Sequence, residues 1–205
     1  MSSETARVEA FSDGVFAIAI TLLILNVQVP PPSAGHLLAA LARQWPTYVA
    51  FLISFAFIGI MWVNHHRLFN HIRRCDNMLM FLNLLLLLGI TVVPFPTALL
   101  AAHYSTPGRT VAAAVFNGTY VFLAISFNVL WFHVVKRGLL DPETQESANS
   151  ISRRYAVGPF SYLVCFALSW INVPLSLALN IGLAIFYALP LRTTPNSRTM
   201  RSATK

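Results

Sequence analysis

Six long apolar segments, separated by short polar breaks, set the hydrophobic pattern of this chain. They cover residues 8–28, 48–66, 78–101, 111–135, 155–171 and 175–191. A helix of roughly 20 apolar residues crosses the hydrocarbon core of a bilayer, and the fifth and sixth segments lie near the lower limit of that length. These two form a tight hairpin around Asn172-Val173-Pro174. The pattern therefore predicts an all-α integral membrane protein with six transmembrane helices.

The polar breaks add two further features. The first outer loop begins with Pro30-Pro31-Pro32, and residues 36–43 after it have the pattern of a short helix at the membrane surface. The basic segment 192–205 contains proline, serine and threonine and is predicted to be a disordered cytoplasmic tail. Because the pattern contains no internal repeat and no second domain, residues 1–191 are predicted to form one transmembrane domain.

Composition also indicates a membrane protein. The chain is 56% hydrophobic and 10% charged, whereas an ordinary soluble domain is about 25% charged. Its mean hydropathy is +0.63. The first helix does not have the pattern of a cleavable signal peptide, because its leading part carries the acidic residues Glu4, Glu9 and Asp13 and no small-residue cleavage site follows. Cys75 and Cys165 lie in different segments without metal-ligand spacing, so neither a metal site nor a disulfide framework is predicted.

The basic residues divide unevenly between the two sides of the predicted membrane. Two of them, Arg43 and Arg109, fall on one side. The other side collects twelve: Arg7, Arg67, Arg73, Arg74, Lys136, Arg137, Arg153, Arg154, Arg192, Arg198, Arg201 and Lys205. Basic residues concentrate in cytoplasmic loops, so both termini are predicted to be cytoplasmic in a multi-pass protein of the cell membrane. The net charge of +7 then fits anionic lipids at the cytoplasmic face, and no basic soluble surface for nucleic acid is predicted.

The first segment carries polar residues at its start and a regular apolar stripe along its length. Helical periodicity places six residues on that stripe: Phe11, Gly14, Ile18, Thr21, Leu22 and Leu25. Ser12 and Asp13 fall well off the stripe, by roughly 120–140° on either side. If the stripe faces a symmetry axis, these two polar side chains point into the helix bundle, where other side chains can satisfy them.

The second segment supplies partners at a similar depth, because it ends with His65, His66 and Arg67. We therefore expect a hydrogen-bonded cluster of Asp13 with His65 or His66, with Arg7 or Arg67 as a further member. An ionisable side chain close to hydrocarbon is costly, so this group is the first candidate for a functional site. Interfacial anchoring is the alternative role for the histidine pair. A metal site is not predicted there, since no Cys or carboxylate completes a ligand set with the two histidines.

The motif Arg7-x-x-x-Phe11-Ser12-Asp13-Gly14, followed by its apolar run, resembles the signature of the transmembrane-protein-175 family of lysosomal and bacterial potassium channels. Trp62-x-x-His65-His66 in the second segment and Pro94-Phe95-Pro96 in the third are also similar to that family. The resemblance covers the whole chain at the level of six spans. A single six-span unit resembles the bacterial members, which are homotetramers. The resemblance therefore implies a homotetrameric cation channel that favours potassium over sodium.

The resemblance also implies roles for individual residues. The first helix would line the pore, with Ile18 as the narrowest ring and Leu22 and Leu25 as rings further outward. Thr21 would offer its hydroxyl to a partly dehydrated potassium ion, which is the permeant ion and not a cofactor. Phe11-Ser12-Asp13-Gly14 would pack the first helix below the constriction. Apolar rings gate narrow passages by dewetting, and the sequence contains no Thr-Val-Gly-Tyr-Gly carbonyl filter.

Two other classes of function compete with the channel. A secondary transporter, proton-coupled through Asp13 and the pair His65 and His66, is the alternative hypothesis. Transporters usually carry paired repeats and helices broken in the middle of the membrane, whereas the prolines here lie near segment ends. An enzyme is not predicted, because the sequence contains no nucleophile with an adjacent base, no metal set and no cofactor loop.

Overall fold

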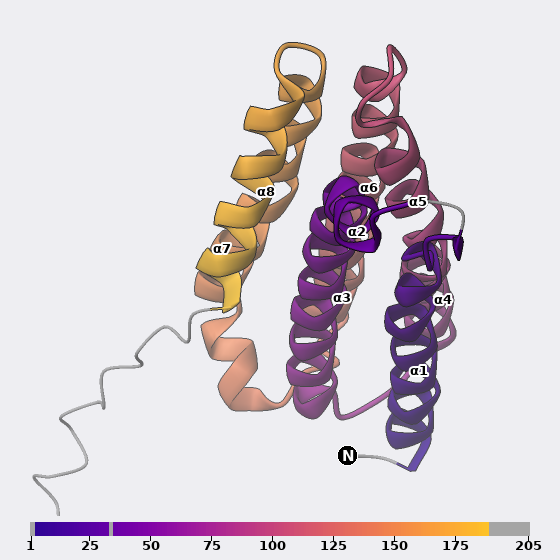
Figure 1. Cartoon of the computed structure of the whole chain (residues 1–205). Coiled ribbons are helices and arrows are strands. Elements are labelled where there is room, and N and C mark those ends of the chain that lie inside the picture. The colour runs from indigo at the N-terminus through magenta and orange to yellow at the C-terminus, as the bar shows by residue number, and fades with distance from the viewer. Residues whose placement is uncertain (1–2, 33–34, 189–205) are drawn as a thin grey trace, which may run out of the picture.

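The structure is a computed structural model that describes residues 3–32 and 35–188. The described chain consists of helices joined by short connections (Figure 1). The elements are α1 (Ser3–Leu22), the 3-10 helix η1 (Leu23–Asn26), α2 (Leu37–Arg43), α3 (Trp45–His71), α4 (Asn77–Val92), α5 (Pro94–His103), α6 (Arg109–Lys136), α7 (Pro142–Ser169) and α8 (Val173–Ala188). No β-strand occurs within these residues, so the predicted all-α class is confirmed. The predicted tail 192–205 lies outside the described residues.

Within the described residues, four helical stretches are long and apolar enough to cross a membrane: Glu4–Asn26, Trp45–His71, Asn77–His103 and Arg109–Lys136. They correspond to the first four predicted segments. The third stretch is divided into α4 and α5 at Pro94, because proline cannot donate the backbone hydrogen bond that a continuous helix needs. The short helix predicted for residues 36–43 is confirmed by α2.

The last two predicted segments differ from the observed helices. Helix α7 begins at Pro142, well before the predicted start at 155, because Asp141 accepts a hydrogen bond from the Thr144 N–H and proline fits the first turn. The first half of α7 is polar, so a hydropathy pattern does not detect it. Helix α8 is short and apolar. Membrane crossing by α7 and α8 therefore stays a prediction.

The long helices lie side by side, with α1 and α4 toward one edge of the view in Figure 1 and the α7–α8 hairpin toward the other. Helix α6 contacts α4, α5, α7 and α8, and α1 packs against α3 and α4. At Gly89, α4 comes so close to α6 that a Cβ atom would lie 2.7 Å from Leu123 Cδ2 and 2.8 Å from Phe122 Cε1. Small residues permit this close approach between helices in membranes.

A buried polar cluster fastens the α7–α8 hairpin to α6. Asn117 of α6 donates through Nδ2 to Ser169 Oγ at 2.7 Å and to Ser176 Oγ at 2.9 Å. Its Oδ1 accepts a hydrogen bond from Asn180 Nδ2 at 2.7 Å. Polar groups in an apolar interior need internal partners, so this cluster fixes which faces of the three helices meet.

At the lower end of the bundle in Figure 1, the turn after α3 is joined to the turn after α6. Ile72 and Leu140 form an isolated antiparallel bridge, and the Asp141 N–H donates to the His71 carbonyl at 2.9 Å. Gly138 takes a φ of +61°, a left-handed conformation that glycine adopts without a Cβ penalty.

The carboxylate of Asp141 holds the start of α7, and we expect its removal to weaken the fold in a pH-dependent way. The hydrogen bond from the Thr144 N–H lowers the pKa of Asp141, burial opposes this effect, and His71 adds to it. With a lowered pKa, the ionised carboxylate stabilises the fold above about pH 4, and this contribution is lost as pH falls through the folded-state pKa. Asp141→Ala should lower the free energy of unfolding at pH 7 by about 1 kcal/mol.

Asp141→Asn is the matched control, because asparagine also caps helices but does not titrate. Thermal unfolding of the purified protein in detergent at pH 7 and pH 3 measures both effects. The native protein should lose more stability at the acidic pH than either variant. An equal loss in all three proteins would show that Asp141 does not carry the pH dependence.

Candidate functional site on the first helix

Helix α1 and its continuation η1 have one packed face and one open face. The packed face consists of buried residues spaced three or four apart: Thr5, Glu9, Ser12, Phe16, Ala19 and Leu23. On the open face, Ile18 is 61% exposed and Leu25 is 71% exposed. The period of 3.6 residues per turn separates the two sets.

All six residues of the predicted stripe are exposed in the single chain: Phe11, Gly14, Ile18, Thr21, Leu22 and Leu25. We call them the exposed stripe. A Cβ atom added to Gly14 would meet no atom within 4 Å, so the chain's own bundle leaves this part of α1 uncovered. The stripe therefore faces away from the other helices of the same chain.

Thr21 is the one residue of the exposed stripe with a polar side chain. Its hydroxyl lies 3.0 Å from the Ala17 carbonyl oxygen and 2.9 Å from the Ile18 carbonyl oxygen, so its proton is directed back into the helix. The lone pairs of Oγ1 are then left on the outer side. A hydroxyl in this state presents an oxygen acceptor, the kind of group that a cation binds.

The packed face of α1 is joined to α3 and α4 by a buried hydrogen-bonded network. Asn83 of α4 donates through Nδ2 to Ser12 Oγ at 2.9 Å, and Ser12 donates to the Val8 carbonyl at 2.8 Å. On its other side, Asn83 Oδ1 lies 2.9 Å from Nε2 of His65 in α3. An amide oxygen can only accept, so Nε2 of His65 is the donor. We call this the Ser12–Asn83–His65 network.

Two aromatic rings hold the imidazole of His65 in place. The ring of Phe69 stacks on it at a centroid distance of 4.3 Å, and the ring of Phe16 lies 5.3 Å away. His65 is completely buried, and its Nδ1 has no hydrogen-bond partner among the described residues. One network bond and two ring contacts therefore fix the orientation of His65.

Asp13 differs from the prediction, because it makes its hydrogen bond with Trp62 and not with a histidine. Asp13 Oδ1 accepts from Trp62 Nε1 at 2.8 Å. The carboxylate beside a histidine is that of Glu9, whose Oε1 lies 2.7 Å from His66 Nδ1. The reason is geometric: Glu9 precedes Ser12 by three residues and shares its packed face, whereas Asp13 lies half-buried at the edge of that face.

The two arginines proposed for the cluster lie outside it. Arg7 on α1 and Arg67 near the end of α3 are both exposed. Neither makes a salt bridge with an acidic residue of the described chain. Phe11 and Gly14 belong to the exposed stripe and not to the network. The first-helix motif is thus divided between the two faces of α1.

Sequence reasoning missed Glu9, Asn70 and Asn83 as members of this site. Asn70 Nδ2 lies 3.1 Å from His66 Nε2, which extends the Glu9–His66 pair. Asn83 had a detectable signal, because it is a single amide inside a continuous apolar run and such a group needs a partner. Glu9 also had one, since its spacing of three residues from Ser12 places both on one face.

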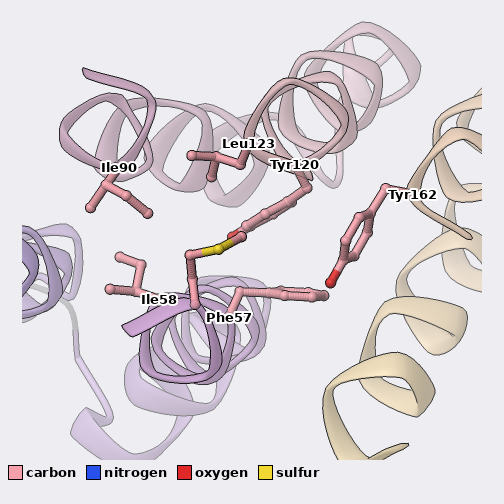
Figure 2. A pocket seen from close by; sticks show the side chains of 7 residues that line it. Phe57, Ile58, Ile90, Tyr120, Leu123 and Tyr162 are labelled. Atoms are coloured by element: carbon pink, nitrogen blue, oxygen red, sulfur yellow. The ribbon is translucent and has the colours of Figure 1, made fainter. Parts of the chain in front are cut away.

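A second buried polar group lies between α3, α5 and α6. Ser54 Oγ and Thr97 Oγ1 are 2.7 Å apart, and the Tyr120 hydroxyl donates to Ser54 at 3.0 Å. Beside it, Figure 2 shows the rings of Phe57, Tyr120 and Tyr162 converging on a small cavity. Its volume of about 10 Å³ holds one water-sized sphere, so it does not accommodate a ligand. Among the described residues, no group of three His, Cys, Asp or Glu side chains could hold a metal ion.

Comparisons with known proteins cover this same region. The family model for the endosomal/lysosomal potassium channel TMEM175 matches residues 7–94, which include the exposed stripe and the network. A potassium channel of Chamaesiphon minutus is 48% identical over 192 residues, or 91% of this chain and 95% of that protein. A human protein named endosomal/lysosomal proton channel TMEM175 is 37% identical over 135 residues, or 61% of this chain and 27% of that protein.

A solved structure agrees with the sequence comparisons. The crystal structure of a lysosomal potassium-selective channel TMEM175 homolog from Chamaesiphon minutus matches with a TM-score of 0.85 at 47% identity, covering 91% of this chain and 97% of that chain. These relatives are ion channels and not enzymes. Because the similarity in sequence and in fold extends over nearly the whole chain, the protein belongs to the TMEM175 family of membrane channels.

Proposed function

We propose that this chain forms a passive, potassium-selective cation channel in the cell membrane. The observation that carries the proposal is the exposed stripe, because Ile18, Leu22 and Leu25 are exposed on a helix whose opposite face is packed. Apolar side chains around an axis make a narrow passage that closes by dewetting. Potassium as the permeant ion is supported by the relatives that are named potassium channels.

In the proposed assembly, four copies surround a central axis and each contributes α1. Ile18 forms the narrowest ring, and Leu22 and Leu25 form further rings along the axis. The number of copies follows from the resemblance of a single six-span unit to the bacterial members. Helices α7 and α8 complete six spans, and the excess of basic residues on one side supports cytoplasmic termini.

Thr21 is the proposed ion-contacting residue. Its hydroxyl proton is engaged by the Ala17 and Ile18 carbonyls, which leaves oxygen lone pairs for a partly dehydrated cation. The Ser12–Asn83–His65 network and the Glu9–His66 pair fix the orientation of α1 about its own axis relative to α3 and α4. That orientation determines which side chains reach the central axis.

The proposal is tested by flux measurements in liposomes that contain the purified native protein. With an outward potassium gradient, we expect passive flux that needs no second gradient and that is faster for potassium than for sodium. A pH-sensitive dye inside the same vesicles reports proton movement, because the human relative is named a proton channel. Equal flux of potassium and sodium would contradict the proposed selectivity for potassium.

A proton-coupled transporter that uses Asp13 with His65 or His66 is the competing hypothesis. Among the described residues, Asp13 hydrogen-bonds to Trp62 and His65 to Asn83, so no direct bond links Asp13 to a histidine. This arrangement favours the channel. Saturable flux that requires a proton gradient and stops in Asp13→Asn would overturn the channel in favour of the transporter.

A further inference from the structure

An open pocket lies where α6 ends and α4 begins, and none of its lining residues belongs to α1. Figure 1 shows these two helix ends at the lower end of the bundle. It is lined by Asp76, Asn77, Met78, His133, Lys136 and Arg137. Its volume is about 540 Å³, so it can receive a group much larger than water. Neither the pore nor the network of α1 uses this pocket.

The carboxylate in the pocket is engaged by the protein itself. Both oxygens of Asp76 lie 3.0 Å from His133 Nε2, and Oδ1 accepts a hydrogen bond from the Leu79 N–H at 2.7 Å. Burial opposes ionisation of Asp76, but the bonds from Leu79 and His133, with the charge of Arg137, lower its pKa. Asp76 therefore orients its neighbours and contributes one negative charge.

The positive charges of the pocket exceed that single negative charge. Arg137 approaches Asp76 through Nε at 3.8 Å, and its side chain is 65% exposed. Lys136 makes no ion pair with an acidic residue of the described chain, and its Nζ lies 5.8 Å from the Phe132 ring centroid. The donors of Lys136 and the outer nitrogens of Arg137 are thus available to an anion.

An apolar surface adjoins these charges. Met78, which lines the pocket, is 52% exposed, and Phe132, one turn before Lys136 on α6, is 65% exposed. Lys and Arg at helix ends in membranes extend their charged groups to the interface while their stems lie on apolar surface. The pocket therefore presents cationic donors next to exposed hydrocarbon, which is the pattern of an amphiphilic anion.

We infer that this pocket binds the phosphate group of an anionic phospholipid through Lys136 and Arg137, with an acyl chain along Met78 and Phe132. Basic pockets between helices on the cytoplasmic side recognise lipid headgroups in this way. The inference rests on the proposed orientation, which places this end of the bundle at the cytoplasmic face. A bound lipid would bridge the beginning of α4 and the end of α6.

Native mass spectrometry of the purified full chain in detergent tests the inference without any flux measurement, so a failure of the proposed channel function does not affect it. Phosphatidylglycerol and phosphatidylcholine with identical acyl chains are added in parallel. The native protein should retain phosphatidylglycerol preferentially. The double variant Lys136→Gln with Arg137→Gln should bind it about thirtyfold more weakly, because each basic residue near an anionic lipid contributes about 1 kcal/mol.

Arg73→Gln with Arg74→Gln is the matched control, since it removes the same charge from two exposed residues of the neighbouring turn that do not line the pocket. It should bind phosphatidylglycerol as the native protein does. Equal losses in both double variants, or equal retention of the two lipids, would overturn the inference. Full displacement by millimolar inorganic phosphate would show a site for free anions instead of lipid. If the double variant does not fold, Lys136→Gln alone serves the same comparison.

Discussion

Shortening Ile18 to alanine is expected to raise potassium flux through the reconstituted protein by about tenfold or more. In the proposed tetramer, four truncated side chains would widen the proposed constriction and admit water, and a barrier lowered by about 1.4 kcal/mol corresponds to a tenfold rate. Ile18 is 61% exposed in the single chain, so its truncation should leave the packing of the fold intact. Potassium flux into liposomes, normalised to the amount of protein inserted, measures the effect.

Leu84→Ala is the matched control for this experiment. Leu84 lies on α4 and is 53% exposed, so its truncation removes a comparable apolar side chain away from the exposed stripe. We expect its flux to equal that of the native protein. If Ile18→Ala and Leu84→Ala gave the same flux, Ile18 would not lie at the constriction.

Replacing Asn83 by leucine is expected to produce the largest loss of stability, about 2–4 kcal/mol. Leucine has a similar volume but leaves both Ser12 Oγ and His65 Nε2 buried without their shared partner. An unsatisfied buried polar group costs more than an absent hydrogen bond, because it is neither solvated nor paired. Thermal unfolding in detergent measures the change.

Two comparisons separate the network from a general effect of the substitution. Asn70→Leu removes an exposed amide that contacts His66, and it should change stability little. Ser12→Ala combined with Asn83→Leu should cost less than the sum of the single variants, because both changes remove the same hydrogen bond from Asn83 Nδ2 to Ser12 Oγ. Strict additivity would mean that Ser12 and Asn83 do not act as a unit.

The two faces of α1 could be predicted from the sequence, because helical periodicity alone assigns Ile18 and Ser12 to different sides. The partners of the polar face could not. Asn83 reaches Ser12 from a helix that lies far along the chain, and periodicity within one segment says nothing about which helix packs against it. Asp13 and His65 lie at a similar depth, but depth does not determine which carboxylate meets which ring.

The length of α7 shows a different limit. The hydropathy pattern predicts a start near residue 155, yet the helix begins at Pro142 because a capping carboxylate and an N-terminal proline start it. These are local signals of helix initiation, and the mean hydropathy of a membrane-spanning segment contains no information about them. The network around Asn117 likewise depends on three helices meeting, which no single segment reveals.

The division of α1 into a packed face and an open face affects which amino-acid substitutions the fold can accept. Side chains of the exposed stripe touch little of their own chain, so exchanging one apolar residue for another there need not disturb folding. The hydrogen bonds of Ser12 and Glu9 lie on the opposite side and stay in place through such exchanges. Substitutions in the exposed stripe could therefore alter conductance in many sequence variants while the packed face of α1 and its hydrogen bonds stay the same.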